Sequence, residues 1–310
     1  MNTNGIHHVT AIAGPVRRNL DFYRNSLGLR VVKKTVNFDD PGTYHLYYGD
    51  AQGQPGTILT FFPWEHAGQG RAGVGETLET TFRVPQGAIG YWAHRLLEKG
   101  VPHEAPRKRF GESVLAFKDP DGMQLALVAV AGAEAEPAWT GGDVPAEHAI
   151  RGFHGVTLLL REAAPTGAIL TDVLGFAEIG REESVTRFRA GDTKEGGIVD
   201  IRAAGNFLRG RQRAGSVHHI AFRAAGNKAQ ADMVSKLAAN HRLHTTEQKD
   251  RNYFRSVYFR EPGGVLFEIA TDDPGFAVDE NEAHLGESLK LPRFLEPRRG
   301  EIEAVLPQLA

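Results

Sequence analysis

The feature that most constrains the fold of this chain is an internal repeat with a period of roughly 65–75 residues. Each of its four copies opens with a short strand-like segment, at residues 6–10, 78–82, 153–157 and 217–221. A helical pattern follows in each copy, as in the first, where Val16, Leu20, Tyr23 and Leu27 fall at helical spacing. Because chance would have to reproduce the same order of segments each time, we predict four copies of one βαβββ module.

The ends of the repeated segments support this prediction. Residues that tolerate a left-handed backbone end the four predicted helices, at Gly28, Gly100, Gly175 and Asn240. Turn residues join the last two strands of each copy, at residues 53–56, 119–122, 196–197 and 261–264. The predicted fold class is α+β, with four tandem modules forming two domains with curved mixed β-sheets. The predicted boundaries are an N-terminal pair of modules at 1–135, a linker at 136–150, a C-terminal pair at 151–271 and a C-terminal extension at 272–310.

Composition excludes several kinds of site. The 310 residues include no cysteine, so disulfides, thiolate nucleophiles, Cys-ligated zinc and iron–sulfur clusters are excluded. A formal charge of −2 gives no reason to expect nucleic acid or a membrane surface as a partner. Residues 1–5 show no signal-peptide pattern, and no apolar run approaches the roughly 20 residues of a membrane helix, so we expect a cytoplasmic protein. The thirteen histidines are a first indication of metal chemistry.

Strand alternation selects one histidine from each of two His-His pairs. Successive side chains of a strand point to opposite faces of its sheet. In the fourth copy Ile220 and Phe222 share a face with His218, so His219 is predicted to face a concave trough on the other side. In the first copy the same reasoning selects His8, which shares its face with Thr10, and places His7 on the helix-covered side. His8 and His219 therefore occupy matching trough positions.

Aligning the closing strands by their turn glycines identifies the remaining positions. Two modules that face each other offer four ligand positions, one on the first strand and one on the last strand of each module. Pairing copies one and four brings together His8, Thr60, His219 and Glu268. Pairing copies two and three brings together Glu79, Ala126, Gly155 and Ile201, which cannot hold a metal. One trough is thus predicted to hold a metal site and the other to be empty.

The set His8, His219 and Glu268 has the composition of a 2-His-1-carboxylate facial triad. Such a triad leaves about three open positions on an octahedral metal, which non-haem Fe(II) oxygenases use for substrate and O₂. A single strand histidine would more often be structural. Two histidines at one repeat position, together with a glutamate where the repeat places another ligand, favour a metal site.

With these residues identified, the chain resembles the vicinal oxygen chelate superfamily, which includes glyoxalases, bleomycin-resistance proteins and extradiol dioxygenases. More narrowly, it is similar to the hydroquinone and chlorohydroquinone ring-cleaving dioxygenases. The matching segments are residues 6–10, 44–47, 217–222, 263–268 and the tail from 279 to 291. The similarity covers essentially the whole chain.

The resemblance implies a non-haem Fe(II), extradiol-type dioxygenase that cleaves a 1,4- or 1,2-dihydroxylated aromatic ring with O₂, with Mn(II) as an alternative metal. It also implies further site residues. Tyr258 lies where the ring-cleaving members carry an active-site tyrosine, and Arg251 where they carry an arginine that contacts substrate. His7, Thr10 and His218 match residues close to the bound quinol, although alternation puts His7 and His218 on the other face unless a bulge turns them. A homo-oligomer is compatible with the sequence.

Two other functions remain open. A glyoxalase-type isomerase or thiol transferase would also need a metal, but this chemistry usually uses a fourth protein ligand in the superfamily, and that position is Thr60. A metal-free protein that binds aromatic compounds would not need the triad. Metal analysis of the purified protein distinguishes the second alternative, and turnover of a glutathione hemithioacetal with zinc or nickel distinguishes the first.

Overall fold

The computed structural model describes residues 5–191 and 193–309, so the prediction about a signal peptide, made on residues 1–5, falls almost entirely outside them. All four predicted modules are present with the order βαβββ. Module one comprises β1 (Ile6–Ala13), α1 (Val16–Asp21), β2 (Arg30–Asn37), β3 (Asp40–Gly49) and β4 (Ile58–Pro63). Module two comprises β5 (Glu76–Pro85), α2 (Ile89–Glu98), β6 (Arg107–Arg109), β7 (Glu112–Lys118) and β8 (Gln124–Val130). Module three comprises β9 (Phe153–Leu160), α3 (Ala164–Asp172), β10 (Phe176–Glu182), β11 (Val185–Ala190) and β12 (Ile198–Ala203). Module four comprises β13 (Ser216–Ala224), α4 (Asn227–His241), β14 (Lys249–Asp250), β15 (Arg255–Arg260) and β16 (Leu266–Thr271).

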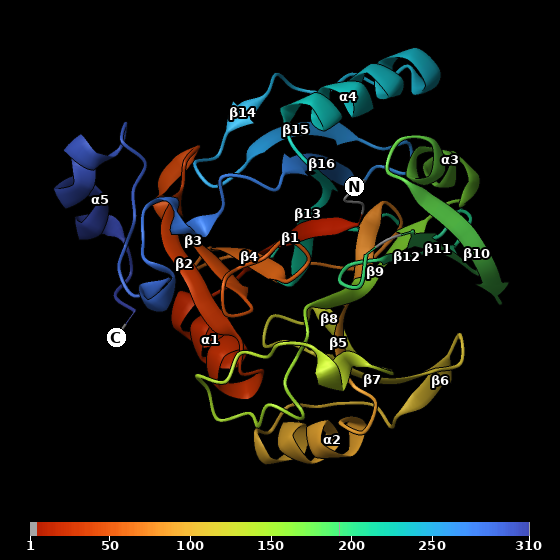
Figure 1. Cartoon of the computed structure of the whole chain (residues 1–310), viewed down its shortest axis with the longest axis horizontal. Helices are drawn as coiled ribbons and strands as arrows, with labels where there is room; N and C mark the ends of the chain where they lie inside the picture. The colour runs from red at the N-terminus through yellow and green to blue at the C-terminus, as the bar shows by residue number, and fades with distance from the viewer. Residues whose placement is uncertain (1–4, 192, 310) are drawn as a thin grey trace.

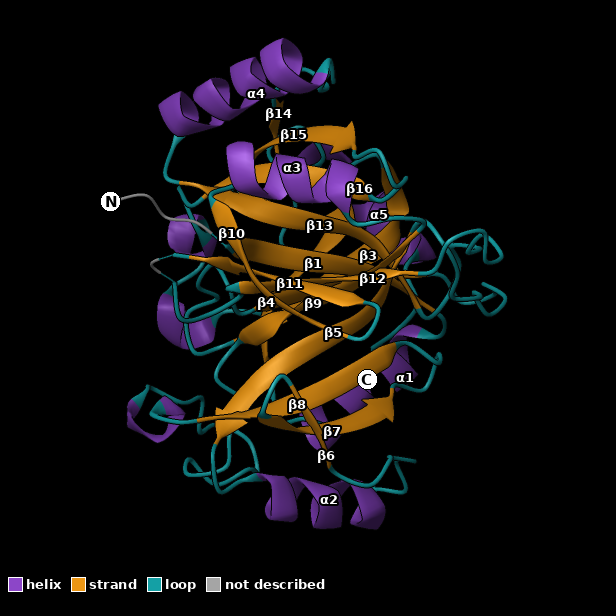
Figure 2. Cartoon of the chain, turned by 90° about the vertical axis from the view of Figure 1, so that its right-hand side faces the viewer, coloured by secondary structure: helices purple, strands orange, loops and turns teal. Residues whose placement is uncertain are grey.

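The sixteen strands form two curved eight-stranded mixed sheets, ordered β14-β15-β16-β13-β1-β4-β3-β2 and β10-β11-β12-β9-β5-β8-β7-β6. Within a module the first strand pairs in parallel with the last, as β1 does with β4. Between modules the first strands pair antiparallel, β1 with β13 and β5 with β9. Module one therefore shares a sheet with module four, as the ligand set requires, and the α+β fold class is confirmed. Figure 1 shows the module helices around the outside of the strands, and Figure 2 shows the first strands side by side.

Each half of the chain contributes one module to each sheet, so residues far apart in sequence share a core. One continuous apolar cluster includes Val9 and Phe222 of the first sheet and Phe82 and Val156 of the second. The division into halves at the linker 136–150 stays a prediction about folding units.

The left-handed residue that ends the fourth module helix lies two residues later than predicted. The chain continues as helix through His241, and Arg242 adopts the left-handed conformation with φ 55° in place of Asn240. The Asn240 side chain instead donates a hydrogen bond to the Asp172 carboxylate, 2.9 Å away on α3. Because this contact holds residue 240 within the helix, the reversal shifts to Arg242. The predicted helix stops at Gly28, Gly100 and Gly175 all have positive φ.

The C-terminal extension packs on the first module, and its main helix is α5 (Arg299–Val305). Leu289 pairs with Lys34 of β2 in an isolated bridge. Leu291, Leu295 and Ile302 form a small apolar cluster with Val36 of the same strand. None of the helices in the described part of the chain is long and apolar enough to cross a bilayer.

Candidate metal centre

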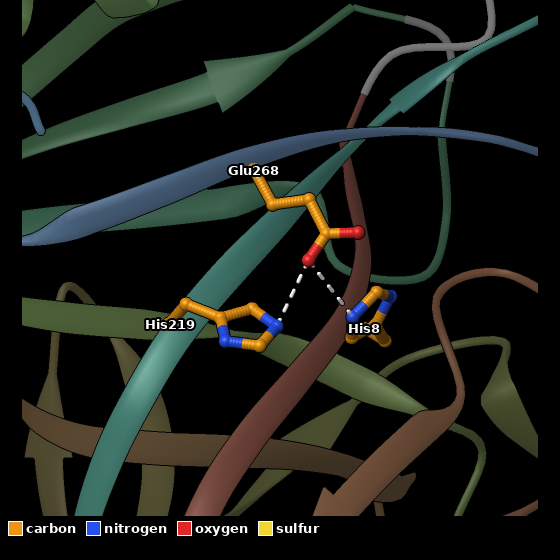
Figure 3. Close-up of side chains that lie close together, drawn as sticks. All are labelled: His8, His219 and Glu268. Atoms are coloured by element: carbon orange, nitrogen blue, oxygen red, sulfur yellow. Dashed lines mark ion pairs between the residues drawn. The ribbon is translucent and has the colours of Figure 1, made fainter. Parts of the chain in front are cut away.

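The three predicted ligands meet at the centre of the first sheet. His8 lies on β1, His219 on β13 and Glu268 on β16, three strands that are neighbours in the sheet. The Nε2 atoms of His8 and His219 lie 3.5 and 2.9 Å from the same carboxylate oxygen, Glu268 Oε2. Figure 3 shows both rings and the carboxylate pointing into one space. Within the described residues this is the one cluster of His, Asp or Glu whose ligand atoms, all within 4.8 Å of one another, could hold a metal ion.

The surroundings of the carboxylate fit a cation. Glu268 is fully buried. Its Oε1 accepts a short hydrogen bond from the Ser256 hydroxyl, whereas Oε2 has no aligned hydrogen-bond donor although His219 Nε2 is close. A buried carboxylate oxygen without a donor is costly unless something positive satisfies it. Two imidazole nitrogens and one unpaired carboxylate oxygen are a ligand set suited to a divalent metal.

Two β-bulges explain where His7 and His218 lie. On β1 the register passes from Ile6 opposite Phe222 to His8 opposite Ala221, so His7 is an extra residue. The neighbouring residues Thr10 and Ala11 of β1 lie opposite His219 and Val217 of β13, so His218 is the extra residue on β13. A bulge breaks the alternation of side chains. Strand alternation therefore selected the two histidines whose side chains converge on Glu268, but its placement of His7 and His218 with the helix-covered side chains was wrong.

Each bulge histidine is hydrogen-bonded to the predicted ligand histidine that follows it. The Nδ1 atoms of His7 and His8 are 2.9 Å apart, and those of His218 and His219 are 2.7 Å apart. Burial lowers the pKa of His7 well below its usual value and the pKa of His218 to about 3. Repulsion from the neighbouring histidine, His8 or His219, is the second cause, and both rings are therefore neutral. A neutral ring can accept the Nδ1–H of its neighbour. This tautomer leaves the Nε2 lone pair of each ligand histidine free for a metal.

The protonation state of Glu268 also suits a ligand. Burial alone would raise the pKa of its carboxyl group, but the opposing effects of His8 and His219 hold that pKa well below the usual value. Burial lowers the pKa of His219. An ionised carboxylate beside a neutral imidazole is the form in which these groups bind metals.

A cavity of about 530 Å³ opens beside the triad. His8 and His219 form part of its wall, and aromatic side chains dominate the rest. The other lining residues are Asn37, Phe38, Asp39, His45, Tyr47, Phe62, Trp64, His218, Thr246, Lys249, Arg251, Phe254, Tyr258 and Leu266. A mostly apolar concave site with a few polar groups is typical for a small organic ligand.

Three of the five further predicted residues line this cavity, namely Tyr258, Arg251 and His218. Tyr258 is the cross-strand partner of Glu268, and its ring lies 5.7 Å from that of His219. Arg251 Nε donates to the Tyr258 hydroxyl over 3.2 Å, and its terminal nitrogen lies 3.1 Å from Asp39. Burial, and next the charge of Glu268, raises the pKa of Tyr258, so the phenol stays protonated.

His7 and Thr10 lie behind the cavity wall. His7 contacts the ring of Phe254, at 5.2 Å between centroids, as well as His8. Thr10 is fully buried, and its hydroxyl is hydrogen-bonded to Thr60, the fourth position of the ligand set, over 3.0 Å. His45 Nε2 lies 2.7 Å from the same Thr60 hydroxyl. The fourth position is therefore occupied by a hydrogen-bonded hydroxyl and offers no carboxylate.

Sequence reasoning missed several cavity residues, above all His45, Tyr47 and Phe254. The Tyr47 hydroxyl lies 2.9 Å from His45 Nδ1, and the Phe254 ring lies 4.8 Å from that of His8. Period-two spacing on β3 puts His45 and Tyr47 on one face, and both belong to a segment that matches the resembled family. That spacing was the available signal. Phe254 lies in a loop, where no periodicity applies.

The second sheet carries the same four positions with a different register from the one predicted. Thr157 of β9 pairs with Asp200 of β12, just as Thr10 pairs with Thr60 in the first sheet. Asp200 is therefore the counterpart of Glu268, and the assignment of Ile201 to this position was wrong. Ile201 is buried in the apolar core instead.

Ion pairs fill the second trough, which was predicted to be empty. Arg187 binds Asp200 through two hydrogen bonds of 2.8 Å and reaches Glu112 at 2.6 Å. His154 also contacts Glu112, at 3.0 Å, and Arg109 contacts Glu79 at 2.7 Å. Because arginine satisfies each of the two repeat-position carboxylates, this trough offers no free ligand set.

Comparisons with known proteins identify the family of this chain. Residues 5–127 match the model of a family described as the Glyoxalase/Bleomycin resistance protein/Dioxygenase superfamily. The chain is 47% identical over 302 residues, 97% of this chain and 95% of the relative, to the "Putative ring-cleaving dioxygenase MhqO" of Bacillus subtilis. It is 32% identical over 308 residues, 96% of this chain and 94% of the relative, to the chlorohydroquinone/hydroquinone 1,2-dioxygenase of Sphingobium indicum.

Solved structures show the same fold. The crystal structure of a protein titled "putative dioxygenase" from Bacillus subtilis matches with a TM-score of 0.95 and 45% identity, over 100% of this chain and 98% of that chain. Glyoxalase I from Zea mays matches with a TM-score of 0.65 and 12% identity, over 87% of this chain and 93% of that chain, and shares the fold alone. The chain therefore belongs to the Glyoxalase/Bleomycin resistance protein/Dioxygenase superfamily and groups, across its whole length, with relatives named as ring-cleaving dioxygenases.

Proposed function

We propose that this protein is a metal-dependent, extradiol-type dioxygenase that opens the ring of a hydroquinone-type aromatic with O₂. The proposed metal is Fe(II), with Mn(II) as the alternative, and the proposed ligands are His8, His219 and Glu268. The reaction inserts both atoms of O₂ and breaks a ring carbon–carbon bond next to a hydroxylated carbon. The relatives named as ring-cleaving dioxygenases, one of them a hydroquinone dioxygenase, support this substrate class.

The observation that carries the proposal is a three-residue ligand set that opens onto an aromatic cavity and lacks a fourth ligand. His8, His219 and Glu268 converge, and the fourth repeat position holds Thr60, whose hydroxyl is already hydrogen-bonded. Three ligands leave adjacent positions for substrate and O₂. The cavity of about 530 Å³ has room for a substituted benzene ring beside these positions.

The metal, when bound, supplies the Lewis acidity that favours the phenolate and the redox chemistry with O₂. The protein's own groups bind and orient the substrate. The rings of Phe62, Trp64 and Phe254 line the cavity and can pack against an aromatic ring. Their apolar surfaces also exclude water from the ring that reacts.

Tyr258 and Arg251 act on the oxygen atoms of the substrate. The raised pKa of Tyr258 keeps its hydroxyl proton available for donation, and the Arg251 guanidinium holds that hydroxyl in place. Donors aimed at a site where negative charge develops stabilise the transition state. Arg251 also carries a permanent positive charge at the cavity wall, where it favours an anionic product.

Oxygen consumption tests this function directly. Protein purified without O₂ is loaded with Fe(II) or Mn(II), and O₂ uptake is measured with hydroquinone, substituted hydroquinones and catechol. We expect uptake with at least one hydroquinone and none for His219→Ala, which loses a ligand. Absence of uptake with every dihydroxybenzene, in protein shown to hold one metal per chain, would exclude the proposed activity.

A further inference from the structure

The loop that carries Arg251 and Phe254 into the cavity has an unusual backbone. It runs from Asp250 to Phe254, between β14 and β15, and Asn252 in its middle has φ 68°. A left-handed conformation is uncommon outside glycine and needs support from its surroundings. Part of that support is local, because Asp250 accepts the Asn252 backbone N–H over 2.8 Å and Phe254 O accepts the Arg251 N–H over 2.9 Å.

The C-terminal extension supplies further support, through the Gly275 backbone N–H, which donates to Tyr253 O over 2.9 Å, and through one carboxylate. Asp279 Oδ2 accepts hydrogen bonds from the Asn252 side-chain amide, over 3.3 Å, and from the Tyr253 hydroxyl, over 3.0 Å. Tyr253 is only 1% exposed, and its ring packs on Phe276 of the extension. The two residues that follow Arg251 are thus attached to a segment that begins after the last strand.

Asp279 is itself anchored to β2 by a buried cation. Its other oxygen, Oδ1, lies 2.5 Å from the amino group of Lys33, which is 0% exposed. Glu280 Oε2 and the Phe276 carbonyl also accept from Lys33. A buried ammonium group needs such partners. Lys33 therefore holds the extension at the sheet, and Asp279 carries that attachment to the loop.

We propose that Asp279 is a positioning residue for Arg251, so that the C-terminal extension forms part of the active site although none of its described residues lines the cavity. The consequence for catalysis rests on the dioxygenase function proposed above. Asp279 acts by holding Asn252 and Tyr253, which fixes the guanidinium beside Tyr258 and the Phe254 ring beside His8.

Two variants separate positioning from general stability. Asp279→Ala removes one carboxylate from Lys33 together with the two side-chain hydrogen bonds from Asn252 and Tyr253. Glu280→Ala is the matched control, because it also removes a carboxylate from Lys33 but has no contact with residues 250–254 among its hydrogen bonds. A third variant, Tyr253→Phe, removes one loop contact and leaves the Lys33–Asp279 pair intact.

Hydrogen–deuterium exchange of the amides at 250–254 is the primary measurement, because it does not depend on activity. We expect Asp279→Ala to raise exchange there by about tenfold, Tyr253→Phe to raise it by less, and Glu280→Ala to leave it near wild type. Unchanged exchange in Asp279→Ala, or equal changes in Asp279→Ala and Glu280→Ala, would overturn the proposal.

The kinetic measurement follows on metal-loaded protein. We expect kcat/KM for the quinol to fall about tenfold or more in Asp279→Ala, with metal content unchanged, and to stay near wild type in Glu280→Ala. If wild-type protein consumes no O₂ with any quinol, the proposed function fails while the exchange result still decides whether Asp279 holds the loop. If activity is present and Asp279→Ala retains it fully, the positioning role is refuted.

Discussion

Substituting the counterpart carboxylates of the two sheets gives a sharp test of the metal centre. Glu268→Gln keeps the shape of the side chain but replaces a charged ligand with a neutral amide, so we expect it to lose the metal. Asp200→Asn makes the same kind of change at the matching position of the second sheet. It leaves buried Arg187 with Glu112 as its remaining carboxylate, so it should lower stability and leave metal binding intact.

The expected sizes follow from general values. A ligand at 100 times its Kd stabilises the folded state by about 2.7 kcal/mol. An unfolding entropy near 2.1 cal/mol/K per residue gives about 0.65 kcal/mol/K for this chain, so saturating metal should raise the wild-type Tm by about 4 °C. Breaking a buried ion pair costs about 3–5 kcal/mol, so the metal-free Tm of Asp200→Asn should lie about 5–8 °C below that of the wild type.

Thermal unfolding with and without Fe(II) or Mn(II), under anaerobic conditions, measures both effects. The metal-induced rise should vanish in Glu268→Gln and persist in Asp200→Asn. A rise of equal size in Glu268→Gln, or the loss of the rise in Asp200→Asn, would refute the metal centre at Glu268.

Three further predictions follow, two from the cavity beside the triad and one from the ion pairs of the second trough. Tyr258→Phe should retain the metal and lower kcat for the quinol by about 10²-fold, the usual contribution of one positioned acid or donor, and an unchanged kcat would remove Tyr258 from the mechanism. Arg251→Met should weaken quinol binding and lower kcat, whereas Arg251→Lys should keep the positive charge but lose the hydrogen bond to the Tyr258 hydroxyl. Steady-state KM and kcat of the two variants test this, and full activity in Arg251→Met would contradict it. Burial alone would raise the pKa of Glu112, but His154 and Arg187 lower that pKa to about 2. The stability that this carboxylate contributes is therefore present above pH 4.5, its ordinary pKa, and is lost as the pH falls towards 2. Urea unfolding midpoints measured across that pH range should fall less steeply in Glu112→Gln than in wild type, and identical profiles would refute this assignment.

The fold could be predicted from sequence because each module repeats the same local signals. Strand segments, helix stops at Gly28, Gly100 and Gly175, and turn residues recur in the same order, so errors in one copy are corrected by the others. The helix end at Asn240 was misplaced because a tertiary contact decided it, the bond from its side chain to Asp172. Local propensity does not contain that contact.

The convergence of three side chains could be predicted because it depends on the strand period and on the pairing of equivalent strands. His8, His219 and Glu268 occupy regular positions, so counting along the strands finds them. His7 and His218 could not be placed in this way, since each is the extra residue of a bulge and a bulge has no signature in the hydrophobic pattern. Asp200 was missed for a related reason, because a one-residue error in aligning the third module moves the position to Ile201.

Modules one and four are expected to hold one cation together. Anomalous diffraction from crystals loaded with Fe(II) or Mn(II) measures this directly, by locating the metal without reference to activity. We predict one strong peak bounded by His8 Nε2, His219 Nε2 and the Glu268 carboxylate, absent from crystals of Glu268→Gln. A principal peak at any other position, or none in protein that is demonstrably active, would contradict the account.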